Sequence, residues 1–147
     1  LPPWHENISK RQVKSPKAWV ADSGLLHTLL DLETFGALER HPKLGASFEG
    51  HCIEQAIAHL GARPKQCFFW GTQAGAELDL LVVRGKERGG FEVKYTDAPS
   101  LTPSMKIALE DLKLDRLEVL YPGTRTYSLH ARVTAVPISR LLQDVKP

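Results

Sequence analysis

Apolar residues recur along this chain at two spacings, one typical of helices and one typical of strands. Residues 45–60 carry an apolar stripe at helical spacing that ends with Leu60, and Gly61 follows as a natural helix stop. Short runs of aliphatic and aromatic residues come next, separated by turns that contain glycine. These runs predict three strands, at residues 66–71, 77–84 and 90–95.

The remaining segments complete this pattern. Thr102 and Pro103 are typical of a helix start, and apolar residues at helical spacing follow them as far as Leu112. Because short connections join the first three strands, we expect an antiparallel meander and then a crossover through this helix. The predicted fold class is α/β, with a mixed central sheet flanked by helices. The other predicted elements are helices at residues 22–30 and 139–145, strands at 117–121 and 128–136, and a short strand or extended segment at 17–20. A loop is predicted from the end of the first helix through residues 41–42.

Four charged residues interrupt these apolar patterns. Asp79 lies inside the aliphatic run 77–84, and Glu92 and Lys94 lie inside the short strand 90–95. Glu49 lies four residues before Ile53 and therefore falls on the inward stripe of its helix. Buried charges are costly unless they are paired or bind a metal, so these positions are candidates for a functional site.

The types and spacing of these residues favour hydrolysis of a phosphodiester at a divalent metal. If the two strands pair in the expected register, Asp79 lies beside Glu92, and the backbone carbonyl of Val93 is a third possible ligand. Oxygen ligands of this kind suit Mg²⁺ or Mn²⁺. Lys94 would orient or help to deprotonate the attacking water, or stabilise developing charge, and Glu49 would add a metal or water ligand.

Each of these charges also has a purely structural interpretation. Lys94 can simply neutralise Asp79 or Glu92 in an ion pair. Glu49 can be a carboxylate near the N-terminus of its helix, where the helix dipole favours negative charge.

Composition narrows the class of protein but does not identify a partner. The chain has 147 residues, of which 42% are apolar and 24% charged, and its net charge is +2. This length suits one domain, and this charge gives no overall argument for nucleic-acid binding. Cys52 and Cys67 lie in apolar segments without metal-ligand spacing, so we expect reduced core thiols in a cytoplasmic protein. We predict no membrane span, because no apolar run approaches the ~20 residues that a span needs.

The first residues have a different character. Residues 1–16 contain three prolines, begin with Leu1 rather than Met, and are interpreted as a connector or hairpin cut from a longer chain, with one domain at 17–147. This basic stretch is either a solvated linker or an arm that contacts DNA. The candidate phosphate contacts are Lys10, Arg11, Lys14 and Lys17.

A helical Glu, then Asp, then Glu-x-Lys on consecutive strands resembles the PD-(D/E)xK nuclease superfamily. Here 12 residues separate Asp79 from Glu92, and Leu78 stands where the motif often has Pro. The resemblance implies a restriction-endonuclease-like αβββαβ core. It also implies that Asp79, Glu92 and Lys94 are the core active-site residues, with Glu49 as the helical acid.

A longer resemblance links the chain to DUF4143 domains. Its blocks, in order, are residues 10–26, 44–49, 69–72, 75–79 and 91–94. The resemblance implies that the chain forms the C-terminal part of a prokaryotic AAA-like ATPase. The resemblance therefore implies that ATP binds in an N-terminal part outside this chain, which fits the lack of a phosphate-binding loop in this sequence.

Three functions follow from these resemblances. The first is a metal-dependent nuclease domain that acts on DNA and is driven or gated by its own ATPase domain. The second is a non-catalytic module that docks DNA or a protein for the ATPase. The third is a structural domain that supports assembly of the ATPase. The sequence leaves the oligomeric state open.

Overall fold

Six strands form one mixed sheet with the order β1-β2-β3-β4-β6-β5. The computed structural model describes all 147 residues. β1, β2 and β3 form an antiparallel meander, β4 lies parallel to β3, β6 lies parallel to β4, and β5 pairs antiparallel with β6 at the edge. The strands are β1 (Cys67–Gly71), β2 (Glu77–Arg84), β3 (Glu87–Val93), β4 (Arg116–Tyr121), β5 (Tyr127–His130) and β6 (Val133–Pro137).

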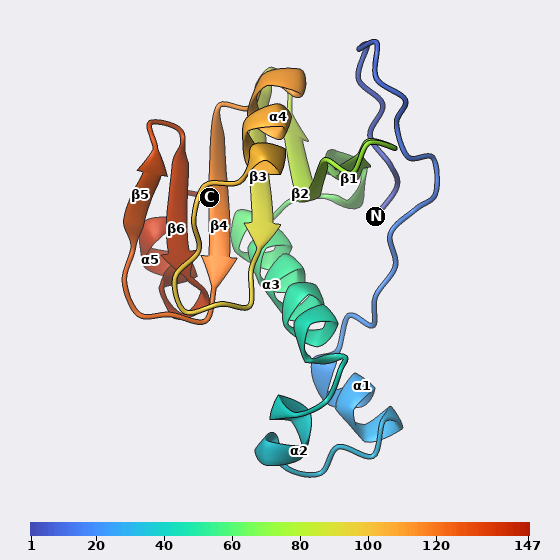
Figure 1. The fold of residues 1–147 in the computed structure, drawn as a ribbon, viewed down its shortest axis with the longest axis vertical. Coiled ribbons are helices and arrows are strands. Elements are labelled where there is room, and N and C mark those ends of the chain that lie inside the picture. Colours follow the sequence, from blue (N-terminus) through green and yellow to red (C-terminus); the bar gives the residue numbers. More distant parts are fainter.

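Helices cover both faces of this sheet (Figure 1). α3 (Leu44–Leu60) and α5 (Leu141–Asp144) pack on one face, here called the α3 face, and α4 (Pro103–Asp111) packs on the other, the α4 face. Each face has its own apolar cluster, of 13 and 12 buried residues. α1 (Ser23–Leu29) and α2 (Phe35–Glu39) lie beyond the N-terminal end of α3, away from the sheet (Figure 1).

The α/β class, the meander and the crossover through a helix are confirmed. Gly61 ends α3 in the left-handed conformation with φ of 58°, and the hydroxyl of Thr102 accepts the N–H of Met105 at the start of α4. Cys52 and Cys67 are buried free thiols. No helix in the structure has the length and apolar character that crossing a membrane requires.

Several predicted elements differ from the observed ones. The single strand predicted at 128–136 is wrong, because the chain reverses between β5 and β6. Residues 17–20 form no strand, the helix predicted at 139–145 is a short 3-10 turn followed by α5, and α2 falls in a predicted loop. α2 has only five residues, too few to show a helical stripe.

An extra residue in β2 changes the direction of its side chains. Phe68 pairs with Leu81 and Trp70 pairs with Leu78, so Phe69 alone lies opposite two residues, Asp79 and Leu80. This is a β-bulge, which breaks the strict alternation of side chains. The clusters agree, because Leu78 and Leu81 both belong to the α4 face although three positions separate them.

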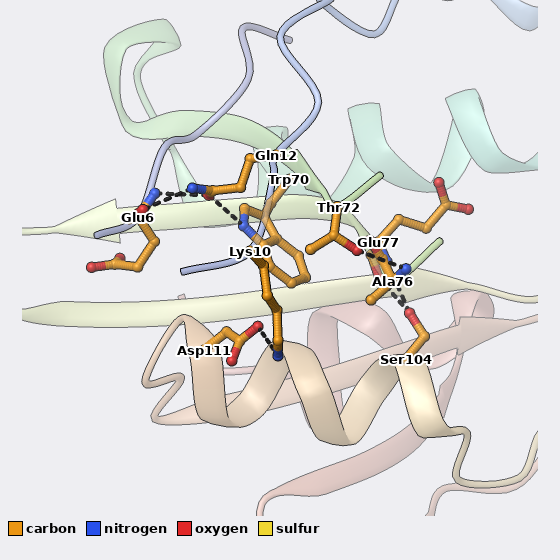
Figure 2. A network of polar contacts seen from close by, with 9 residues as sticks. All are labelled: Glu6, Lys10, Gln12, Trp70, Thr72, Ala76, Glu77, Ser104 and Asp111. Carbon is orange, nitrogen blue, oxygen red and sulfur yellow. Dashed lines mark hydrogen bonds and ion pairs between the residues drawn. The ribbon is translucent and has the colours of Figure 1, made fainter. Parts of the chain in front are cut away.

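The N-terminal residues lie along the outer edge of β1. Isolated bridges join Pro3 to Phe69 and Gln12 to Thr72. The side chain of Gln12 accepts the indole N–H of buried Trp70 at 3.0 Å and also bonds to both backbone groups of Glu6 (Figure 2). The segment 1–17, here called the N-terminal arm, thus covers an edge strand that would otherwise offer free backbone groups. The division of the chain at residue 16 stays a prediction.

A buried carboxylate lies in the middle of β4. Glu118 is buried beside Phe91 and Thr134, and its only ion-pair partner is Arg116, at 3.4 Å. Its Oε2 atom has no hydrogen-bond partner. Burial raises the pKa of Glu118 to about 7, against a smaller lowering by Arg116. Its position inside the apolar run 117–121 is the signal in the sequence that could have identified Glu118 as a buried charge.

The bond between Gln12 and Trp70 generates a first prediction. We expect Gln12→Ala to lower the free energy of unfolding by about 1–3 kcal/mol, because it leaves a buried indole N–H without an acceptor. Gln73→Ala is the matched control, since Gln73 is exposed, and we expect a change within about 0.5 kcal/mol. Urea unfolding measures both values, and equal losses in the two variants would show that the Gln12 side chain does not hold the arm.

Glu118 generates a second prediction. Its pKa is higher in the folded chain than in the unfolded chain, so the unfolded state loses its proton first as pH rises. The stabilisation is therefore complete below about pH 4.5 and is lost as pH rises through about 7. We expect Glu118→Gln to remove on the order of 2 kcal/mol of this pH-dependent loss. Urea unfolding between pH 5 and pH 8 tests it, and an unchanged slope with pH would contradict it.

Candidate active site

The four predicted site residues meet at one end of β2 and β3. Asp79 lies near the start of β2, while Glu92 lies at the end of the antiparallel β3 and Lys94 follows directly after it. Leu80 and Phe91 are the last pair of the ladder, and Asp79 and Glu92 are the next residue of each strand beyond it. Glu49 reaches the same end of the sheet from the second turn of α3.

Asp79 uses both of its carboxylate oxygens. Its side chain is 6% exposed, and Oδ2 accepts the backbone N–H of Val93 at 2.9 Å. Oδ1 lies 2.7 Å from the Nζ atom of Lys17. The paired register of β2 with β3 stops at Leu80–Phe91, so the Asp79 carboxylate joins the two strands where their paired register ends.

Lys17 of the N-terminal arm joins Asp79 to Glu49. Its Nζ atom lies 2.6 Å from Oε1 of Glu49, and the ring of Phe69 lies 5.4 Å away. Burial opposes the charge on Lys17, but the carboxylates of Asp79 and Glu49 outweigh it, and the pKa of Lys17 is raised. Burial and the charge of Asp79 raise the pKa of Glu49, against the opposing effect of Lys17.

Glu92 and Lys94 form a second pair on the other face. A Cβ added to Gly90 would meet Leu114 and Leu78 of the α4 face, and Glu92, two residues later, points the same way. Oε1 of Glu92 lies 2.6 Å from Nζ of Lys94, and its buried Oε2 has no hydrogen-bond partner. Burial and then the charge of Asp79 raise the pKa of Glu92 to about 7, although Lys94 lowers it.

The structure thus brings the predicted residues together as two neighbouring groups. One group on the α3 face contains Glu49, Lys17 and Asp79, and the other on the α4 face contains Glu92 and Lys94. No three His, Cys, Asp or Glu side chains lie close enough to one another to hold a metal ion. The carboxylate oxygens of these residues are of the type that Mg²⁺ and Mn²⁺ prefer, and the unpartnered Oε2 of Glu92 fits a cation. Between Glu49 and Asp79, however, the ammonium of Lys17 already supplies the positive charge.

The four basic residues predicted to contact nucleic acid have separate surroundings. Lys10 pairs with Asp111 of α4 at 2.6 Å (Figure 2). Arg11 and Lys14 are exposed on the arm. Lys17 contacts Asp79, and the sequence did not predict this contact because it joins positions 62 residues apart; its role in nucleic-acid binding stays a prediction.

Comparisons with known proteins agree with the resemblance to DUF4143. A family described as "Domain of unknown function (DUF4143)" matches residues 44–141. A second, "Domain of unknown function (DUF8612)", matches residues 1–35, which include the N-terminal arm and α1.

Two curated mycobacterial proteins are similar over nearly the whole chain. They are "Uncharacterized protein Rv2008c" of Mycobacterium tuberculosis and "Uncharacterized protein Mb2031c" of Mycobacterium bovis. Each is 49% identical over 142 residues, which cover 97% of this chain and 32% of the relative. No solved structure matches the chain. On the match over residues 44–141, the chain belongs to the DUF4143 family.

Proposed function

We propose that this domain is a PD-(D/E)xK-type nuclease domain that hydrolyses phosphodiesters of DNA with Mg²⁺ or Mn²⁺. The observation that carries the proposal is that Asp79, Glu92 and Lys94 lie at the point where β2 and β3 stop pairing, with Asp79 bonded to the N–H of Val93 and Glu92 paired with Lys94. Three carboxylates and a half-exposed lysine lie at this end of the sheet, and one buried carboxylate oxygen there has no partner.

The oxygens available to an ion come from three elements. Asp79, Glu92 and Glu49 supply carboxylates, and Val93 supplies its carbonyl. A strand residue directs its N–H and C=O to the same neighbouring strand, and the N–H of Val93 bonds to Asp79, so its carbonyl faces that side too. The ion would neutralise the phosphate and promote ionisation of the attacking water.

Lys94 suits a contact with the substrate phosphate. Its side chain is 41% exposed, yet Glu92 holds its Nζ atom at 2.6 Å. In the proposed reaction the water oxygen bonds to phosphorus and the bond to the leaving ester oxygen breaks with its electron pair. Water releases a proton to solvent and the leaving oxygen takes one up. The ammonium of Lys94 stabilises the negative charge that builds on the phosphate oxygens.

The mycobacterial relatives are about three times as long as this chain, which supports a proposal about a partner domain. This chain spans 32% of each mycobacterial relative, so most of such a protein lies outside the described domain. We propose that an ATP-binding AAA-like domain is the partner of this one and controls its access to DNA. Arg11 and Lys14, both exposed, are the arm residues that remain available for phosphate contacts.

A docking module is the second candidate function. Lys17 already neutralises charge between Glu49 and Asp79, and no three acidic side chains are grouped for a metal. In this case DNA binding depends on salt and on the arm. We expect the double variant Arg11→Ala, Lys14→Ala to bind a DNA duplex more weakly and with a smaller salt dependence, whereas Asp79→Asn leaves both unchanged. Fluorescence anisotropy at several salt concentrations measures this, and equal binding by all three proteins would exclude the arm as the contact.

The nuclease proposal predicts the loss of cleavage on single substitutions. We expect Asp79→Asn and Lys94→Ala each to lower the rate of Mn²⁺-dependent DNA cleavage by about 100-fold or more, because each removes a charge next to the reacting phosphate. Asn keeps an acceptor for the N–H of Val93, so the fold should survive.

Glu87→Gln is the matched control for these variants. Glu87 is an exposed acid that begins β3, at the end of the β2–β3 ladder away from the site. Cleavage should continue at the original rate. Cleavage that persists in Asp79→Asn, or that is absent from the original protein with both metals, would reject the nuclease proposal.

A further inference from the structure

The ammonium of Lys17 lies at the point that two carboxylates share. Its Nζ atom is 2.6 Å from Oε1 of Glu49 and 2.7 Å from Oδ1 of Asp79. The two oxygens are therefore no farther apart than the sum of these distances, and both face the same centre. Three separate parts of the chain, the N-terminal arm, α3 and β2, contribute to this arrangement.

A divalent ion at these oxygens would need the place that Lys17 holds. The other oxygen of Asp79 already accepts the N–H of Val93, so Oδ1 is the oxygen that an ion would use. An ammonium and a divalent ion bound to the same two oxygens would repel each other strongly in a half-buried site. Binding of the ion therefore requires Lys17 to withdraw.

The structure allows the side chain of Lys17 to move without the arm. The backbone N–H of Lys17 donates to the carbonyl of Leu1. Two residues later the indole of Trp19 packs against Gly50 of α3 and donates to Glu54 at 3.0 Å. Anchors on both sides hold the backbone, while the four-carbon stem of a lysine has free rotations. The side chain is 24% exposed, so a path to solvent exists.

We propose that Lys17 is a built-in competitor for divalent metal at Glu49 and Asp79. This inference rests on the proposed metal-dependent function. The site binds a metal ion only when the Lys17 ammonium leaves, so metal affinity is set by this lysine as well as by the acids. A substrate phosphate that attracts Lys17 would favour the same exchange.

Metal titration of the whole 147-residue chain tests the proposal. We expect Lys17→Met, which keeps the length of the side chain without its charge, to bind Mn²⁺ at least about tenfold more tightly than the original protein. Lys10→Met is the matched control, because Lys10 is a lysine of the same arm and also pairs with an aspartate at 2.6 Å, that of Asp111. Its affinity for Mn²⁺ should equal that of the original protein.

The possible results distinguish failure of the proposal about Lys17 from failure of the proposed metal-dependent function. Equal, measurable Mn²⁺ affinity in Lys17→Met and the original protein overturns the inference and leaves the metal site standing. Tight binding by Lys17→Met alone supports both. The absence of binding in all three proteins overturns the metal-dependent function, and the inference with it.

Chemical labelling provides a measurement that needs no variant. Acetylation of lysines in the original protein, followed by mass spectrometry, reports how freely each amine reacts. We expect Mn²⁺ to increase the labelling of Lys17 several-fold relative to exposed Lys14, which lies on the same arm. Unchanged relative labelling at Mn²⁺ concentrations that saturate the site would overturn the proposal.

Discussion

The bulge in β2 decides how the polar side chains of this site are distributed. In an unbroken ladder Asp79 would share the α4 face with Glu92, its neighbour across the strands. Because Asp79 and Leu80 together oppose Phe69, Asp79 turns to the α3 face, where it meets Lys17. The same extra residue lets Leu78 and Leu81 both bury on the α4 face. One local irregularity thus satisfies the apolar core and places a carboxylate between two charged groups.

The N-terminal arm connects the edge of the sheet with the site. Its bridges to Phe69 and Thr72 and the bond of Gln12 to Trp70 cover the free edge of β1. This docking fixes the path of the chain so that Lys17 reaches Asp79. A segment that protects a strand edge therefore also supplies a cation to buried acids. The arm lies inside the match to the second family, over residues 1–35, whereas the acids lie inside the DUF4143 match.

The sequence predicted those features that depend on local periodicity. The stripe of α3 and its stop at Gly61 were visible, and so was the helix start at Thr102. The reversal between β5 and β6 was not, because the two-residue turn at 131–132 preserves the alternation of apolar positions on either side. The position of Lys17 depends on contacts across 62 residues, which no local spacing encodes. The sequence did not predict the bulge either, because a strand that is buried on both faces has aliphatic residues throughout and no alternation that a bulge would interrupt.

The balance of charge explains why a lysine stands where a metal ion was expected. Asp79, Glu49 and Glu92 carry three negative charges when ionised, and Lys17 and Lys94 supply two positive ones. One negative charge remains uncompensated in partly buried surroundings, because Glu49 and Asp79 share the single ammonium of Lys17. Replacement of the Lys17 ammonium by a divalent ion would bring the sum to zero. The acids hold together without metal because two lysines nearly neutralise them, and in the proposed metal-bound state the remaining charge would favour a divalent ion over Lys17.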